Sequence, residues 1–133
     1  ERIARHQRER PKWLTIEEPF DITSAIKNAP SSACIIIDCL TLWVSNLMMR
    51  ETSEQEISSA CTKSLSAISQ HNGKTIVISN EVGLGVVPET ALGREYREIL
   101  GRVNQQWARA ARQSLFLIAG KAFPLHDPQE ILQ

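Results

Sequence analysis

Three short apolar segments alternate with amphipathic stretches along this chain. The segments are ACIIIDC (33–39), KTIVISN (74–80) and SLFLIAG (114–120), and β-branched or other apolar residues dominate each of them. Continuous apolar runs of this length, without alternating polar positions, are typical of strands that are buried on both faces of a parallel sheet. We therefore expect three buried strands.

The first and second of these segments are separated by a stretch with helical spacing. Residues 40–51 indicate one helix. Ser53 and Glu56 have the spacing of a capping box, which predicts the start of a second helix. Asn72 and Gly73 then provide a stop signal.

Further helices are expected on either side of this region. A long helix over about 89–112 has one apolar stripe, formed by Leu92, Tyr96, Ile99, Val103, Trp107 and Ala111. Asp21 is a suitable N-cap for a short helix near 22–28. Residues 1–9 contain good helix formers and precede Pro11, which ends a helix, and the tail after 120 is expected to be loose.

Strands that alternate with helices in this way predict an α/β protein with a mainly parallel sheet, built from two βαβ units. In such sheets, ligands bind beyond the carboxyl ends of the strands. The residues expected at that edge are Asp38, Asn80, Glu81, Gly120 and Lys121.

The composition is that of an ordinary globular protein, and we expect one domain over residues 1–133. The chain is 42% hydrophobic and has 15 acidic and 15 basic residues, so its net charge is zero. Neutral charge and the lack of a nucleic-acid-binding motif argue against a nucleic acid partner. No apolar run reaches the roughly 18 to 20 residues of a membrane span. The three cysteines match no zinc pattern and suit a reducing, cytoplasmic setting.

Two acidic residues after strands are candidates for ligand contacts. Asp38 follows an apolar strand, as does the magnesium-binding aspartate of P-loop nucleotide enzymes, although a strand-end Asp is also a common helix cap. Glu81 precedes Gly83 and Gly85, which would allow close approach of the backbone to a ligand. The same loop could equally be an ordinary connection.

The first ten residues hold one histidine among several arginines. On a helix, Arg2, His6 and Arg10 share one face. Nearby cations lower the pKa of an imidazole, and the neutral form is a nucleophile. The arginines could also bind a phosphate. The alternative interpretation is a solvated basic helix with an incidental histidine.

Four stretches that cover most of the chain resemble the bifunctional adenosylcobinamide kinase / adenosylcobinamide-phosphate guanylyltransferases of cobalamin biosynthesis. They are RIARHQRERPKWLTIEEP (2–19), IIIDCLTLWVSNLM (35–48), TIVISNEVGLGVVPET (75–90) and LGREYREILGRVNQQWARAA (92–111). The resemblance implies a P-loop NTPase-like α/β fold and a homo-oligomer. It implies phosphorylation of adenosylcobinamide with ATP or GTP. It also implies transfer of GMP from GTP to the resulting phosphate through a GMP-histidine intermediate, which gives adenosyl-GDP-cobinamide.

The resemblance also assigns roles to residues. His6 corresponds to the histidine that carries GMP. The nucleotide-binding residues would be Gln7, Arg8, Glu9, Arg10, Glu17 and Asp38, with Asp38 also at the Mg²⁺ site and with Arg2 and Glu81 in support. Glu18 is the alternative to Glu17, because family members usually have one more residue before the tryptophan of this stretch.

The chain departs from the family in one respect. Family members begin with a strand followed by GxxxxGK[ST], and this chain contains no such motif. We interpret it as a member that lacks the N-terminal strand, P-loop and helix, with an exposed sheet edge that favours assembly. Kinase activity is then not expected from this chain alone, and its guanylylation is in doubt. The alternative function is a non-catalytic remnant that serves as an oligomerisation or interaction module.

Overall fold

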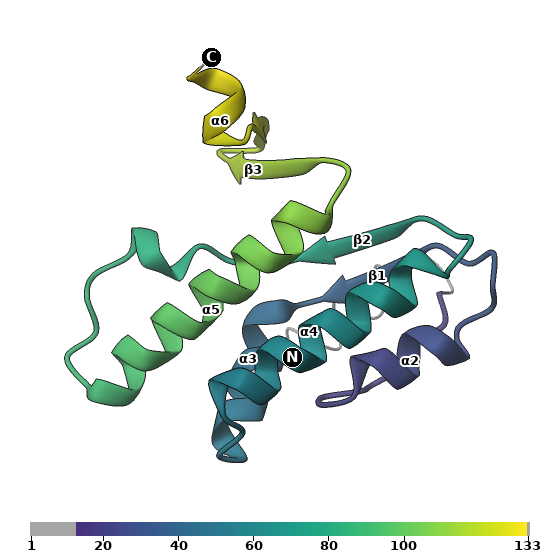
Figure 1. Cartoon of the computed structure of the whole chain (residues 1–133), viewed down its shortest axis with the longest axis horizontal. Coiled ribbons are helices and arrows are strands. Elements are labelled where there is room, and N and C mark those ends of the chain that lie inside the picture. The colour runs from purple at the N-terminus through teal and green to yellow at the C-terminus, as the bar shows by residue number, and fades with distance from the viewer. Residues whose placement is uncertain (1–12, 133) are drawn as a thin grey trace.

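A two-stranded parallel sheet lies at the centre of the computed structural model, which describes residues 13–132 (Figure 1). Strand β1 (Ile35–Asp38) pairs with β2 (Thr75–Ile78). The crossover between them contains helices α3 (Leu40–Met49) and α4 (Glu54–Ser69). One βαβ unit of the predicted parallel α/β fold is thereby confirmed.

Within residues 13–132 the helices that were predicted from local signals are present, whereas the helix expected over residues 1–9 lies outside the described residues. Asp21 caps α2 (Ile22–Asn28), and its side chain accepts a hydrogen bond from the Ser24 amide at 3.0 Å. Both bonds of the capping box between Ser53 and Glu56 form at the start of α4. The long helix α5 (Ala91–Ala110) begins after Thr90.

The core lies on one face of the sheet, where the helices pack. Its buried residues are Ile22, Leu40, Trp43, Val44, Leu47, Ile57, Cys61, Ile99, Leu100, Val103 and Trp107, and Ile37 and Val77 of the sheet pack against them. The indole of Trp43 donates to the carbonyl of Phe20 at 2.7 Å, which joins the segment before α2 to α3.

The opposite face of the sheet is not buried, so the prediction of strands covered on both faces is wrong for β1 and β2. Ile36, Ile76 and Ile78 are 40%, 45% and 41% exposed. The helices of the described residues contribute to a core on one face only, and alternate strand residues therefore point away from it.

The third strand is also placed differently from the prediction. Strand β3 (Ser114–Ile118) pairs antiparallel with β4 (Lys121–Leu125) in a separate two-stranded sheet. Figure 1 shows this hairpin beyond the end of α5, apart from the β1–β2 sheet. The second predicted βαβ unit is therefore wrong, and Gly120 and Lys121 lie at the hairpin turn instead of beside Asp38.

A local cause explains the hairpin. Ala119 and Gly120 both have positive φ, 51° and 71°, which matches the twist of a tight two-residue hairpin turn. The residues expected to form a loose tail provide β4 and a short helix α6 (Pro128–Ile131), which Asp127 caps through the Gln129 amide.

Among the described residues, no helix is both long enough and apolar enough to span a bilayer.

Candidate functional site

Polar residues gather at the carboxyl ends of β1 and β2. Asp38 is the last residue of β1, is exposed, and lies opposite Ile78 in the strand register. Ser79, Asn80 and Glu81 follow β2 directly. The prediction that Asp38, Asn80 and Glu81 share one edge of the sheet is confirmed.

Thr41 joins this edge to the first turn of α3. Its hydroxyl accepts hydrogen bonds from the backbone amide of Asn80 at 3.1 Å and from the side-chain amide of Asn80 at 2.8 Å. Its carbonyl accepts one from the Tyr96 hydroxyl at 3.1 Å. Burial raises the pKa of Tyr96, and the neighbouring Cys39 thiol adds to the rise, so this phenol remains a donor at neutral pH.

Asn104 of α5 holds the residues that follow β2. Its side-chain nitrogen donates to the carbonyl of Asn80 at 3.1 Å and to a carboxylate oxygen of Glu81 at 2.6 Å. Its side-chain oxygen accepts from the Ser79 hydroxyl at 2.6 Å. One amide group on a rigid helix therefore fixes the direction of the Glu81 carboxylate.

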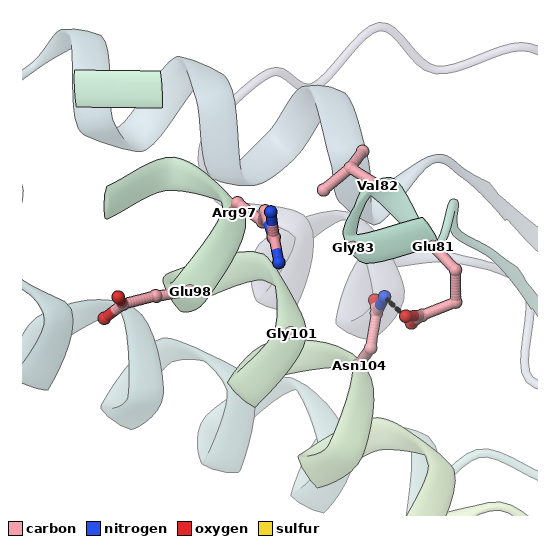
Figure 2. Close-up of a pocket in the computed structure, with 7 residues that line it drawn as sticks. All are labelled: Glu81, Val82, Gly83, Arg97, Glu98, Gly101 and Asn104. Carbon is pink, nitrogen blue, oxygen red and sulfur yellow. Dashed lines mark hydrogen bonds between the residues drawn. The ribbon is translucent and has the colours of Figure 1, made fainter. Parts of the chain in front are cut away.

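An open pocket of about 100 Å³ lies between α5 and the 3-10 turn η1 (Val82–Leu84) (Figure 2). Its lining residues are Glu81, Val82, Gly83, Arg97, Glu98, Gly101 and Asn104. Figure 2 shows the Arg97 side chain on the side of α5 that faces η1, whereas the Glu98 side chain points away. The pocket thus has a carboxylate on one wall and a guanidinium on another.

The predicted nucleophile and most of the predicted nucleotide contacts lie outside the described residues. These are Arg2, His6, Gln7, Arg8, Glu9 and Arg10. Their roles stay predictions.

The two glutamates of the TIEEP stretch have different environments. Glu18 accepts the backbone amides of Phe20 and Asp21, both at 2.9 Å, and these bonds lower the pKa of its carboxyl. Its carboxylate is therefore engaged in the turn before α2. Glu17 is exposed, and its contact with the nucleotide stays a prediction.

Asp38 provides a carboxylate at this edge that could bind a divalent cation. Residues 13–132 contain no group of three or more His, Cys, Asp or Glu side chains that could hold a metal ion. Mg²⁺ does not require such a cage, because in nucleotide enzymes it is commonly held by one or two carboxylates and by substrate phosphates. The exposed carboxylate of Asp38 fits that arrangement.

Sequence reasoning missed the parts of this site that depend on pairing across the fold. No motif or spacing in the sequence singled out Thr41, Arg97 or Asn104. Asn104 does lie in the GRVNQ stretch that supports the family resemblance. Asn104 and Glu81 are 23 positions apart, so only the packing of α5 beside η1 shows that they meet.

A protein-family model described as cobinamide kinase / cobinamide phosphate guanyltransferase matches residues 1–125. The chain belongs to this family. The match includes the segment that holds His6, and it confirms the resemblance drawn from the four sequence stretches.

Individual proteins give the same result. The bifunctional adenosylcobalamin biosynthesis protein CobP of Pseudomonas aeruginosa is 36% identical over 126 residues, which cover 93% of this chain and 72% of that protein. The bifunctional adenosylcobalamin biosynthesis protein CobU of Escherichia coli is 31% identical over 133 residues. Its counterpart in Salmonella typhimurium is 32% identical over 134 residues. Each of these two matches covers 90% of this chain and 74% of the relative.

Proposed function

We propose that this chain takes part in cobalamin biosynthesis as a guanylyltransferase. It transfers GMP from GTP to adenosylcobinamide phosphate and gives adenosyl-GDP-cobinamide, after phosphorylation of adenosylcobinamide with ATP or GTP. The observation that carries this proposal is the family match over residues 1–125, which includes His6.

The proposed transfer has two steps. The neutral imidazole of His6 attacks the α-phosphorus of GTP, a P–N bond forms, and the P–O bond to pyrophosphate breaks. A phosphate oxygen of adenosylcobinamide phosphate then attacks the same phosphorus, and the histidine leaves. The covalent intermediate divides one difficult displacement into two easier ones. Arg2 and Arg10 would neutralise charge that develops on the phosphate.

The described residues supply the remaining contacts. Asp38 at the end of β1 would hold Mg²⁺ together with phosphate oxygens, and Glu17 would contact the nucleotide. A bound Mg²⁺ would neutralise part of the triphosphate charge. Asn80 and Thr41 keep the ends of β1 and β2 together, so that Asp38 has a fixed position beside them.

Mass measurement of the intact chain after incubation with GTP and MgCl₂ tests this proposal. We expect a gain of one GMP that is labile in acid and absent from His6→Ala. His126→Ala is the matched control and should keep the adduct, because His126 is an exposed residue of the hairpin region. An adduct that persists in His6→Ala, or no adduct on the unaltered chain, contradicts the proposal.

A second candidate function is a non-catalytic assembly module. Apolar side chains are exposed on the open face of the β1–β2 sheet and on the β3–β4 hairpin, and such surfaces commonly mark interfaces. This alternative predicts self-association of the chain together with no GMP adduct.

A further inference from the structure

We propose that the pocket between α5 and η1 binds the amide edge of a substrate, namely a peripheral carboxamide side chain of the corrinoid. This inference rests on the proposed function, because that function supplies an amide-bearing substrate. It assigns a binding role to Glu81 and Arg97, whose side chains line the pocket together.

The charges of the pocket select the ligand. A phosphate would be repelled by the Glu81 carboxylate, and a cation would be repelled by the Arg97 guanidinium. A primary carboxamide is neutral and has both kinds of hydrogen-bonding group: its carbonyl accepts from a guanidinium, and its NH₂ donates to a carboxylate. Both bonds would be strengthened by the charge of the protein group.

The carboxylate is held in place before a ligand arrives. One oxygen of Glu81 is bonded to Asn104 at 2.6 Å, and the other, Oε2, lies 4.0 Å from the position of a Cβ added at Gly83, which also lines the pocket. Arg97 forms no hydrogen bond or ion pair with another residue in the range 13–132. Its donors therefore remain available to a ligand carbonyl.

The loop that follows the pocket residue Gly83 exposes apolar side chains. Leu84 and Val86 follow Gly83 in the chain and are 74% and 93% exposed, and Val87 next to them is also exposed. Ligand sites typically combine apolar contact surface with a few fixed polar groups. A large macrocycle with amide-bearing arms matches this combination, because its body can contact the apolar loop while one arm enters the pocket.

Guanine has a similar edge, with ring N–H and NH₂ groups beside a carbonyl. The shared chemistry is therefore an amide edge, and GTP must be measured beside the corrinoid. Glu17 and Asp38, the candidate nucleotide contacts among the described residues, do not line this pocket, which is why we assign the pocket to the corrinoid.

Gly101 provides a steric test that does not depend on removing a charge. A Cβ added at Gly101 meets nothing within 4 Å, so Gly101→Ala would place a methyl group at the pocket without a clash in the protein. Alanine is also preferred over glycine inside a helix. The thermal midpoint of this variant should be at or above that of the unaltered chain, so weaker binding could not be attributed to unfolding.

Equilibrium dialysis with adenosylcobinamide measures the effect. We expect Arg97→Ala and Glu81→Gln each to raise the dissociation constant about tenfold, the cost of one lost charge-assisted hydrogen bond. Gly101→Ala should also raise it, because the added methyl group takes up space that the ligand needs. Glu95→Gln is the matched control and should leave it unchanged, because Glu95 is exposed on α5 and does not line the pocket. A corrinoid with a carboxylate in place of a peripheral amide should bind more tightly to Glu81→Gln than to the unaltered chain.

Three results would overturn the inference. They are equal corrinoid affinity in all variants, no corrinoid binding by the unaltered chain, and a shift in GTP affinity alone. The last result would assign the pocket to guanine. The GMP adduct on His6 is a separate readout. If the adduct forms and all variants bind the corrinoid with equal affinity, the pocket assignment is wrong and the proposed function stands. If no adduct forms, the proposed function alone is contradicted.

Discussion

The side chain of Asn104 forms hydrogen bonds with more residues of the candidate site than the side chain of any neighbouring residue on α5. Its side chain makes three hydrogen bonds, to Ser79, Asn80 and Glu81, and these are the residues that follow β2. A side chain that satisfies several polar groups at once leaves all of them unpaired when it is removed. Its contribution should therefore exceed that of an ordinary exposed polar residue.

We predict that Asn104→Ala lowers the free energy of unfolding by about 1 to 3 kcal/mol, even though alanine is the better helix former. Urea unfolding measures this loss. Gln105→Ala is the matched control, since Gln105 is exposed at the next position of α5, and its effect should be small. Equal stability of the two variants would mean that solvent replaces the Asn104 bonds without cost.

The cysteines differ in the environment of their thiols. Cys61 is fully buried in the core, and burial raises the pKa of its thiol. Cys34 is exposed. Since the thiolate is the reactive form, the folded chain should leave Cys34 reactive and protect Cys61, while the third cysteine, Cys39, is half-buried.

We predict that iodoacetamide at about pH 8 modifies Cys34 quickly and Cys61 only after unfolding. Peptide mass spectrometry of samples quenched over time gives the rate at each site. The same reaction in denaturant is the control, and there Cys34 and Cys61 should react at similar rates. Rapid labelling of Cys61 in the folded chain would show that α4 does not keep its place in the core.

At the scale of elements, the capping box of α4 contributes both stability and its pH dependence. The Glu56 carboxylate accepts bonds from the Ser53 hydroxyl and the Ser53 amide, and these lower the pKa of Glu56 below its ordinary value near 4.5. A carboxyl group with a lowered pKa stabilises the folded state above its unfolded pKa. That stabilisation is lost as the pH falls through the folded value.

We predict that Ser53→Ala costs about 1 kcal/mol of unfolding free energy near neutral pH, the usual cost of losing an N-cap. Below pH 4.5 the difference from the unaltered chain should shrink, because protonated Glu56 no longer makes the charge-assisted bonds. Urea unfolding at several pH values measures the difference, with Ser59→Ala as an exposed control inside α4. A difference that does not depend on pH would argue against the carboxylate bonds.

The helices were predictable because their signals are local. Asp21 and Ser53 lie within three residues of the amides that they cap, so sequence spacing was sufficient. The strands were only partly predictable. The sequence shows that residues 35–38 and 75–78 are apolar, but not whether a second layer covers Ile36 and Ile76. Strand β3 could pair either with the distant β1–β2 sheet or with the segment that follows it in the chain. The turn at Ala119 and Gly120 allows the second pairing, and a local hairpin closes with a smaller loss of conformational entropy.

The candidate site was predictable to the same extent. The rule for parallel sheets placed Asp38 and Glu81 at one edge, because each follows its strand directly. The amide that orients Glu81 comes from the middle of α5, where a polar residue on a long amphipathic helix normally faces solvent. No periodicity distinguishes Asn104 from such a residue.

On the scale of the whole molecule, the distribution of apolar surface is uneven. The β3–β4 hairpin exposes Leu115, Leu117, Ile118, Phe123 and Leu125. An isolated two-stranded hairpin is at best marginally stable in water, and it usually needs further strands or a helix against its apolar face. The hairpin therefore needs a surface to pack against, and a second copy of the chain carries complementary apolar surface on its open sheet face.

We predict that the chain self-associates and that Leu117→Lys weakens this association about tenfold or more, since the charge would have to be buried in the interface. Leu117 is a suitable site because it is 71% exposed, so the substitution should leave the fold of a single chain intact. Size-exclusion chromatography with light scattering over a concentration series gives the mass. Ser66→Lys on the exposed side of α4 adds the same charge and should have no effect. If the unaltered chain is monomeric at every concentration, or if both variants associate equally, the hairpin must pack against a different partner, and assembly through it would no longer support the alternative function.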